Sequence, residues 1–362
     1  MADIDNIEEV KVLDKENVYD SVVEFPKQCL DAWDANKDLQ VPDTYKGVNK
    51  IVMTGMGGSG LGARVIESVF ANDLPCPLIR VNDYDLPKWV DDKTLVICSS
   101  FSGTTEETIE NVRQAKEKGT KWMAIGTGGG LIDAAKEAQV PYYQINPVYN
   151  PSRQPRMAVG YSIIGQLVMA SKTGLISLSK DEVDEIVRAA DEVQAGIRID
   201  VPTENNEAKQ LAKKLQGRQV VFSVARHLLA SAHVAKNQMN ENAKNFSSIF
   251  EIPELNHHLM EGLRFPETNK QDLFFLFFES DLYPERITQR VNITKDVVGK
   301  NEIAHHSWKA KSGTKLSQAF ELIQFCAFVN FYLAMLNGLD PAPIPWVDYF
   351  KEQLGQPLGQ WK

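Results

Sequence analysis

The sequence predicts an α/β protein of two tandem domains, each a mainly parallel sheet flanked by helices. Three observations support this fold class. Short apolar segments alternate with helical patterns, as in parallel sheets whose strands are joined by crossover helices. This pattern stops at a polar stretch, residues 202–206, and then starts again. A chain of 362 residues also exceeds the usual size of a single hydrophobic core.

The first half contains five apolar segments that we expect to be strands. They are Ile51–Thr54, Leu78–Asn82, Leu95–Ser99, Lys121–Ile125 and Pro141–Ile145. Turns rich in glycine, or in serine and threonine, follow the first, third and fourth of these segments. Such turns lie beyond the carboxyl ends of parallel strands, where ligands of open sheets bind. A polar helical stretch at Lys180–Gln194 then leads to the linker at 202–206.

The second half repeats the pattern without repeating the sequence. The expected strands are Gln219–Val224, Ser248–Ile252, Asp272–Phe278 and, more weakly, Asn301–His306, with a helix at Leu228–Lys244. A long apolar helix is predicted at Leu316–Leu336, ended by Gly338 and Asp340-Pro341. Its length would suit a membrane span, but Glu321, Gln324 and Asn330 favour a core helix. We expect an N-terminal extension at 1–30, a first domain at 31–200 and a second at 201–362.

The composition restricts the class of protein and its compartment. Hydrophobic residues make up 43% and charged residues 24%, as in soluble globular proteins. A net charge of −9 argues against nucleic acid or an anionic membrane as partner, so an anionic substrate must be held by local geometry. The acidic start, Met1–Asn17, is unlike a secretory signal. The four cysteines are scattered, as expected of reduced thiols in a cytoplasmic protein: Cys29, Cys76, Cys98 and Cys326.

A glycine loop, Gly55–Gly60, follows the first expected strand. Its sequence G-M-G-G-S-G satisfies the pattern G-x-G-x-x-G, and Asn82-Asp83 ends the next strand. Together these features are compatible with a dinucleotide-binding enzyme that uses Asp83 for the ribose. The physical basis is general, however, because glycines let backbone N–H groups approach any phosphate. A tight turn without a ligand explains the loop equally well.

A second candidate phosphate site follows the third expected strand. Six hydroxyl residues surround one glycine in the sequence S-S-F-S-G-T-T-E-E-T at 99–108. We call Ser100–Thr105 the hydroxyl loop. The helix that follows would direct free N–H groups and several hydroxyls at one point, which suits a single phosphate dianion. Helix capping alone would need one hydroxyl. The absence of a P-loop lysine and of a magnesium-binding acid in this sequence weighs against a nucleoside triphosphate.

These motifs resemble a known family. The segment 100–108 matches S-x-S-G-x-T-x-E-T, the phosphate loop of the sugar isomerase (SIS) domain superfamily. More narrowly, the chain resembles the bifunctional phosphoglucose/phosphomannose isomerases from Phe25 to Leu354. The similar segments are G-M-G-G-S-G at 55–60, Pro155-Arg156, Asn240–Lys244, Glu254–His257 and Asp340-Pro341 with Lys351.

The resemblance implies two SIS-type domains, the first binding phosphate and the second supplying the catalytic base and a histidine. It implies phosphate binding by Gly57, Gly58, Ser59, Ser100, Ser102 and Thr105, and catalysis by Glu241, His257, Lys351 and Arg156. The expected substrates are glucose 6-phosphate, fructose 6-phosphate and mannose 6-phosphate. We expect no cofactor and no metal, no nucleic acid or membrane partner, and a homodimer with shared active sites.

Aldose–ketose isomerisation needs a group for ring opening, a base at C1 and C2, and a positive charge for the enediolate. Glu241 is the candidate base, since an ordinary glutamate near pKa ~4.3 is ionised at neutral pH. His257 is the candidate for ring opening because imidazole titrates near neutrality, with His258 as its rival. Arg156, with Arg153 as its rival, would stabilise the enediolate. Lys351 matches the family lysine that assists ring opening, and His305-His306 receives no role.

The chain departs from the family in one place. The family has a small hydroxyl residue, usually threonine, before the terminal helix, where it helps both C2 epimers to fit. Residues 341–345 here read P-A-P-I-P and contain none, so phosphoglucose activity is the firmer expectation. The alternatives are a non-catalytic sugar-phosphate-binding SIS protein, the dinucleotide enzyme, and a glucosamine 6-phosphate synthase. The last normally has a cysteine nucleophile at its N-terminus, where this sequence reads Met1-Ala2.

Overall fold

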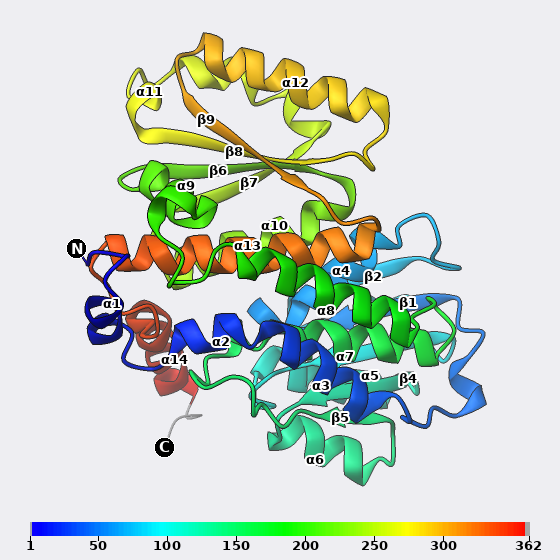
Figure 1. Ribbon diagram of the computed structural model, residues 1–362. Coiled ribbons are helices and arrows are strands. Elements are labelled where there is room, and N and C mark those ends of the chain that lie inside the picture. The colour runs from blue at the N-terminus through cyan, green and yellow to red at the C-terminus, as the bar shows by residue number, and fades with distance from the viewer. Residues whose placement is uncertain (1, 359–362) are drawn as a thin grey trace.

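The computed structural model describes residues 2–358 and contains two parallel sheets separated by a layer of helices (Figure 1). The first sheet has the order β2-β1-β3-β4-β5, and the second has the order β7-β6-β8-β9. All neighbouring strands within each sheet are parallel. The predicted α/β class with two parallel sheets is therefore confirmed. The strands are β1 (Lys50–Thr54), β2 (Leu78–Val81), β3 (Thr94–Ser99), β4 (Lys121–Gly126), β5 (Tyr142–Gln144), β6 (Gln219–Ala225), β7 (Ser247–Ile252), β8 (Leu273–Ser280) and β9 (Ala304–Ala310).

Helices cover both faces of the first sheet, and a central layer of helices lies between the two sheets (Figure 1). The helices are α1 (Ile7–Leu13), α2 (Val18–Val23), α3 (Phe25–Asn36), α4 (Leu61–Val69), α5 (Glu106–Glu117), α6 (Gly129–Glu137), α7 (Val159–Lys172), α8 (Lys180–Ala195), α9 (Glu207–Leu215), α10 (Leu229–Glu241), α11 (Asn269–Asp272), α12 (Glu285–Lys300), α13 (Lys315–Leu336) and α14 (Pro345–Leu358). Helices α5 and α6 pack on one face of the first sheet, whereas α3, α4 and α7 pack on the face toward the second sheet.

The alternation of side chains along a strand explains this arrangement. Successive residues of a strand point to opposite faces of its sheet. In β1, Ile51 and Met53 therefore join the core with α3, α4 and α7, while Val52 between them joins the core with α5 and α6. Both faces of the sheet are apolar, so its strands read as continuous hydrophobic runs.

Helix α13 is a core helix of both halves. It is long and apolar enough to cross a membrane, but the whole apolar stretch is buried inside the protein. Phe320 belongs to the core of the first sheet and Phe325 to that of the second. The Glu321 carboxylate accepts bonds from the backbone N–H groups of Lys311 and Ser312, at 2.9–3.0 Å. The prediction of a core helix is confirmed.

Two predicted elements have boundaries that differ from the structure by three residues or more. The helix expected at 228–244 ends at Glu241, and Lys244 lies in the left-handed region with φ of 51°. The strand expected at 301–306 begins at Ala304, because Asn301 and Glu302 form the turn that ends α12. In this turn the Asn301 N–H donates to the Val297 carbonyl, and Glu302 has a φ of 57°.

The N-terminal segment is anchored to the second half. Ile4 and Val10 are buried in the core of the second sheet. The fully buried amine of Lys209 binds the Asp5 carboxylate at 2.8 Å and the carbonyls of Ile199 and Val201. These contacts join the N-terminus, the polypeptide between the halves, and α9.

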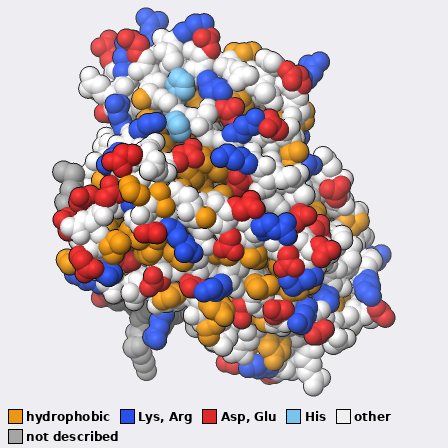
Figure 2. All heavy atoms as spheres, in the orientation of Figure 1, with side chains coloured by type: hydrophobic (Ala, Val, Ile, Leu, Met, Phe, Trp, Pro, Cys, Tyr) orange, Lys and Arg blue, Asp and Glu red, His pale blue; other side chains and the backbone are white. Residues whose placement is uncertain are grey.

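Charged side chains of both signs are interspersed over the face shown in Figure 2. Histidines are exposed over the second sheet on this face. His305 and His306 line an open hollow there of about 700 Å³, together with Lys295, Asp296 and Lys300.

Candidate active site

The first sheet has a switch point between β1 and β3. In the order β2-β1-β3-β4-β5, the connections from β1 and β3 leave in opposite directions, and ligands of such sheets bind beyond this point. The glycine loop follows β1, and the hydroxyl loop follows β3. The fold therefore brings the two sequence motifs together at one edge of the sheet.

The hydroxyl loop is held in a shape that only glycine permits at its centre. Gly103 has a φ of 71°, and an added Cβ would lie 1.7 Å from the Gly128 carbonyl oxygen. Ser100 is 1% exposed, and its Oγ lies 2.8 Å from Thr105 Oγ1 and accepts the Gly103 N–H at 3.1 Å. Ser102 is exposed, and its Oγ accepts from the Thr104 N–H and hydroxyl.

The N-terminus of α5 completes this loop. Thr105 occupies the N-cap position, but its side chain makes no capping hydrogen bond, because its hydroxyl meets Ser100 instead. The first N–H groups of α5 are therefore left without a side-chain acceptor at the cap. N–H groups of this kind, with hydroxyls beside them, are a suitable site for an anion.

The glycine loop is bonded to the hydroxyl loop and lies against Arg156. Ser59 Oγ accepts the N–H of Phe101 at 2.9 Å, which links the two loops. An added Cβ at Gly58 would lie 3.4 Å from the Pro155 carbonyl oxygen and 3.6 Å from Arg156 Cα. An added Cβ there would make ordinary van der Waals contact, so the glycine loop and the Pro155-Arg156 segment pack directly against each other. Asp83, which the dinucleotide alternative requires, binds the backbone N–H of Tyr84 at 2.7 Å.

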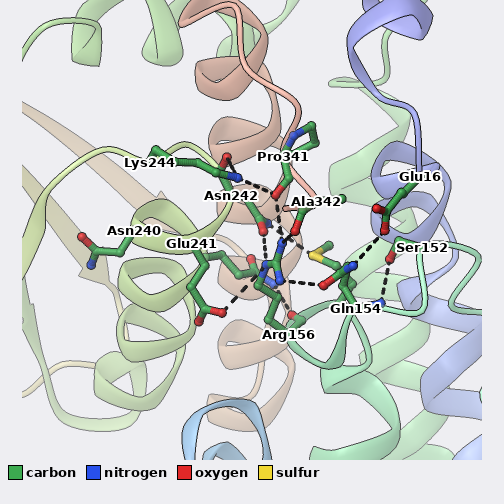
Figure 3. A network of polar contacts seen from close by, with 12 residues as sticks. Glu16, Ser152, Gln154, Arg156, Asn240, Glu241, Asn242, Lys244, Pro341 and Ala342 are labelled. Atoms are coloured by element: carbon green, nitrogen blue, oxygen red, sulfur yellow. Dashed lines mark hydrogen bonds and ion pairs between the residues drawn. The ribbon is translucent and has the colours of Figure 1, made fainter. Parts of the chain in front are cut away.

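Arg156 is 3% exposed and joins both halves to the C-terminal segment (Figure 3). Its Nη2 donates to the carbonyls of Pro341 at 2.9 Å and Ala342 at 2.6 Å. Its Nη1 donates to Gln154 Oε1 at 2.9 Å, and its Nε donates to Asn242 Oδ1. These four hydrogen bonds use four of the five N–H groups of the guanidinium. The remaining N–H group, on Nη1, has no acceptor among these contacts.

Glu241 is the last residue of α10 and points toward Arg156 (Figure 3). Its Oε2 lies 3.9 Å from Arg156 Nε, and its side chain remains 32% exposed. Burial raises the pKa of Glu241 above its ordinary value, while the nearby charges of Arg156, Lys236, Lys244 and Lys351 oppose this shift. A carboxylate of this kind is a stronger base than a solvated one and is still held beside positive charge.

The neighbouring asparagines, Asn240 and Asn242, do not orient Glu241. The Asn240 side chain turns away toward β7 and bonds to Ser247 and to the Lys236 carbonyl (Figure 3). Asn242 accepts from Arg156 and approaches Met157 Sδ. The reason is that consecutive residues of a helix project about 100° apart, so Asn240 and Asn242 lie to either side of Glu241 and do not face it.

Lys244 and Gln154 are site residues that our sequence analysis missed. The Lys244 amine donates to the Pro341 carbonyl at 2.8 Å and the Asp340 carbonyl at 3.1 Å, and burial lowers its pKa to about 8. Gln154 bridges Arg156 to the Glu16 carboxylate of the N-terminal segment, at 2.9 Å on each side. Of these two residues, only Lys244 could have been found from the sequence, because it is the last residue of the Asn240–Lys244 segment that resembles the family.

The remaining predicted residues lie outside this network. His257 is exposed at the end of a short 3-10 helix, Glu254–His257, and makes no hydrogen bond or ion pair within residues 2–358. His258 is also exposed, with its ring 6.1 Å from that of Phe250. Lys351 is exposed on α14, and its charge acts on Glu241 without a hydrogen bond. Arg153 is exposed, so Arg156 is the arginine that lies beside Glu241.

The described residues contain no group of three or more histidine, cysteine, aspartate and glutamate side chains arranged to hold a metal ion. The candidate site accordingly consists of a loop of hydroxyls before α5 on the first sheet, and a carboxylate beside a buried arginine at the end of α10. The two parts are contiguous through Ser59, Gly58 and Arg156.

This fold and site define a sugar-phosphate-binding protein of the SIS type. Residues 204–354 match the family model described as the bacterial phospho-glucose isomerase C-terminal SIS domain. The crystal structure of a hypothetical protein from Thermus thermophilus superposes with a TM-score of 0.73 at 15% identity, covering 93% of this chain and 90% of that one.

Curated relatives identify the family. A bifunctional phosphoglucose/phosphomannose isomerase from Caldicellulosiruptor bescii is 33% identical over 94% of this chain and 99% of the relative. Another from Aquifex aeolicus is 30% identical over 94% of this chain and 98% of the relative. The chain belongs to the bifunctional phosphoglucose/phosphomannose isomerase family.

Proposed function

We propose that this protein interconverts glucose 6-phosphate and fructose 6-phosphate, and also mannose 6-phosphate, by proton transfer through a cis-enediolate. The observation that carries the proposal is the contiguity of the two loops, Arg156 and Glu241. In the proposed complex, one open-chain hexose phosphate would place its ester at the hydroxyl loop and its C1 and C2 at the carboxylate. The first domain, 31–200, would hold the phosphate, and the second, 201–362, would supply the base.

Each group has a distinct role in the proposed reaction. Gly57, Gly58, Ser59, Ser100, Ser102 and Thr105 bind the phosphate through hydroxyls and N–H groups. Glu241 removes the proton from C2 of the aldose or C1 of the ketose and returns it to the neighbouring carbon. Arg156 faces the enediolate with a fixed positive charge and its one free N–H group. Lys351 assists ring opening and binds sugar hydroxyls.

His257 would serve the active site of a partner subunit in a homodimer. Its exposure, and the absence of any side-chain hydrogen bond or ion pair to it among residues 2–358, support this assignment. In this arrangement the imidazole opens the sugar ring in a site whose base belongs to the other protomer.

The decisive assay supplies fructose 6-phosphate in D₂O and measures both aldose products and deuterium at C2, with and without EDTA. We expect glucose 6-phosphate and mannose 6-phosphate, both labelled, and no effect of EDTA. Binding of fructose 6-phosphate without product or exchange would favour the non-catalytic sugar-phosphate-binding alternative. Residues 341–345, before α14, lack the threonine that helps both C2 epimers to fit in the family. Formation of mannose 6-phosphate is therefore the more stringent part of the test.

A mixing experiment tests the shared site. Glu241→Gln and His257→Gln variants are each expected to be nearly inactive alone. When their subunits are exchanged, one of the two sites in each mixed dimer regains both groups, so up to a quarter of the parental activity per subunit should return. Mixing either variant with itself is the control. An absence of recovery in proven mixed dimers would place both groups in the same protomer's site.

A further inference from the structure

Arg156 is surrounded by hydrogen-bond acceptors that carry no charge. Its guanidinium donates to the side-chain amide oxygens of Gln154 and Asn242 and to the carbonyls of Pro341 and Ala342. None of these acceptors is a carboxylate, so none cancels the positive charge of the buried arginine. That charge is the property of Arg156 that the proposed reaction uses.

Glu16 lies one amide group away from this guanidinium (Figure 3). Gln154 Oε1 accepts from Arg156 Nη1 at 2.9 Å, and Gln154 Nε2 donates to Glu16 Oε2 at 2.9 Å. A guanidinium only donates and a carboxylate only accepts, so the amide between them has one possible orientation. Rotating the amide by half a turn would place donor against donor and acceptor against acceptor. The two contacts therefore form one chain of hydrogen bonds with a fixed direction.

This chain of hydrogen bonds acts on the end of Arg156 that has a hydrogen left to donate. Nη1 carries two N–H groups, of which one binds Gln154 and the other has no acceptor among the contacts of Arg156. Gln154 therefore determines the direction in which the second N–H group points. Hydrogen bonds in a chain polarise one another, so the Glu16 carboxylate makes the Gln154 oxygen a stronger acceptor. Burial lowers the pKa of Arg156, and the charges of Glu241 and then Glu16 are the largest that oppose this shift.

Glu16 is held in place by the turn that precedes α2. The Asp14 carboxylate accepts the N–H groups of Val18 and Tyr19, each at 2.8 Å, and Asn17 has a φ of 58°. These bonds close a turn that contains residues 15–17. A carboxylate on a fixed turn loses less conformational freedom on bonding than one on a mobile segment, so Glu16 is well placed to hold Gln154.

A second contact joins this segment to the loop that carries Gln154. Ser21 Oγ donates to Ser152 Oγ at 2.8 Å and accepts the Ser152 N–H at 2.9 Å, and both serines are buried. The Gln154 carbonyl accepts from Asn150 Nδ2 at 3.0 Å, which fixes the backbone of the loop. The N-terminal segment thus meets this loop at Ser152 and again at Gln154, just before Arg156 in the chain.

We propose that Glu16 and Gln154 are positioning residues for Arg156, and that the neutral amide between carboxylate and guanidinium preserves the charge that faces the enediolate. This inference rests on the proposed function, since it uses the role given there to Arg156. The N-terminal segment would accordingly take part in the reaction without touching the sugar.

The first test removes each positioning residue and measures kcat and KM for fructose 6-phosphate. Arg156 would act on the enediolate more than on the bound sugar, so kcat should fall while KM stays within about twofold. Gln154→Met, which keeps a side chain of similar length, should lower kcat by about 10- to 100-fold, as expected for a displacement of about 1 Å. Glu16→Ala should lower it by about 3- to 10-fold, because the Gln154 oxygen remains but is a weaker acceptor. A rise in KM with kcat unchanged would refute the proposal, because both residues would then serve substrate binding.

A double variant and a matched control show whether Glu16 acts through Gln154. If it does, Glu16→Ala should add less than about twofold to the loss in Gln154→Met, because the contact it works through is already absent. The control is Asp20→Ala, which removes an exposed carboxylate of the same segment whose side chain makes no hydrogen bond or ion pair within residues 2–358. Its kcat should stay near the parental value. Losses that multiply in the double variant, or an equal loss in the control, would contradict the proposal.

Exchanging the two side chains tests the position of the neutral amide. In Glu16→Gln/Gln154→Glu both hydrogen bonds can form again, but a carboxylate now lies against Arg156. Its charge would cancel part of the charge that faces the enediolate, so kcat should remain at least about tenfold below the parental value, with thermal stability retained. This variant leaves no contact empty, so it also serves as the test if Gln154→Met does not fold. A return of kcat to the parental value would overturn the proposal.

The parent and Arg156→Gln separate this inference from the proposed function. We expect Arg156→Gln to lose at least as much kcat as Gln154→Met. A parent that converts fructose 6-phosphate, with Glu16 and Gln154 variants as active as the parent, would refute this inference alone. A parent without conversion would refute the proposed function, and an Arg156→Gln variant as active as the parent would refute the role of Arg156 in it. Either result would remove the basis of this inference as well.

Discussion

The two sheets have the same strand order at their switch points, but the proposed phosphate site lies on the first alone. β1 and β3 in the first sheet correspond to β6 and β8 in the second. After β3 the chain forms a loop of hydroxyls around Gly103, in which Ser100 Oγ meets Thr105 Oγ1 and accepts the Gly103 N–H. After β8 the chain continues as Ser280, Asp281, Leu282 and Tyr283 before α12.

Side chains fill the second position. Ser280 Oγ donates to Gln318 Oε1 at 2.6 Å, and Asp281 pairs with Lys309 at 2.5 Å. The buried Tyr283 hydroxyl lies 2.9 Å from the Ala225 carbonyl, directly at the end of β6. The comparison shows that the strand order provides a place for a ligand beyond the switch point of each sheet. The residues of the loop that follows β3 or β8 decide whether that place stays open. The second half contributes through Glu241 instead.

The largest effect is expected when the proposed base, Glu241, is removed. This change tests whether the second half supplies the base while the first half binds the phosphate. Glu241→Gln should lower kcat by about 10²- to 10⁴-fold, as expected for loss of a positioned general base. The dissociation constant for fructose 6-phosphate should change little, because the phosphate is held by the first half. Rapid kinetics and equilibrium binding measure the two quantities separately. A variant as active as the parent would show that the base lies elsewhere.

Gly103→Ala should have the next largest effect. The new Cβ would meet the Gly128 carbonyl at 1.7 Å, so the hydroxyl loop must move. We expect kcat/KM for fructose 6-phosphate to fall by at least about 100-fold, since a displacement of about 1 Å in a binding loop costs that much. The control is Gly217→Ala, which has a similar φ of 74° with open space around it. That variant should lose some thermal stability and keep its activity.

Single hydroxyl deletions sharpen the comparison between the two loops. Ser100→Ala should raise KM for fructose 6-phosphate by about 10- to 100-fold, the size of one hydrogen bond to a charged group. Ser280→Ala at the corresponding place in the second sheet should change KM by less than about twofold. Steady-state kinetics with both variants gives the contrast. Equal effects would mean that the second loop also contacts substrate.

The smallest expected effect is on the pH profile. The Lys351 charge lowers the pKa of Glu241, so Lys351→Met should raise it. Because the base acts when ionised, activity is lost as pH falls through this pKa, and the acidic limb of kcat/KM should move to higher pH. Lys351→Arg should leave the limb in place even if the rate declines. A shift to lower pH in the methionine variant would contradict the assignment.

Local patterns in the sequence were sufficient to predict the strands and the hydroxyl loop. The hydroxyl loop depends on residues within one turn of each other, and its glycine is required by one backbone angle. Short apolar segments likewise indicated nearly every strand of both sheets. The core role of α13 was predictable because its polar residues occur inside an apolar run.

Contacts between distant segments could not be predicted in this way. Nothing near Arg156 indicates that its guanidinium binds the carbonyls of Pro341 and Ala342, which are 185 and 186 residues away. The side-chain partners of Asn240 and Asn242, which are Ser247 in β7 and Arg156, are likewise set by the tertiary fold. The proposed role of His257 also depends on a distant contact. Its side chain is exposed in a single chain and would reach an active site only in a second subunit.

Helix α13 packs in the hydrophobic cores of both sheets, and this has a consequence for the synthesis of the protein. A nascent chain emerges from the ribosome in sequence order, and α13 comes after every strand of both sheets. Neither core can therefore close until this late helix has been translated, however early the first sheet pairs. Maturation should depend on holding the early part of the polypeptide soluble until then, and fragments that stop before residue 315 should be degraded or aggregate.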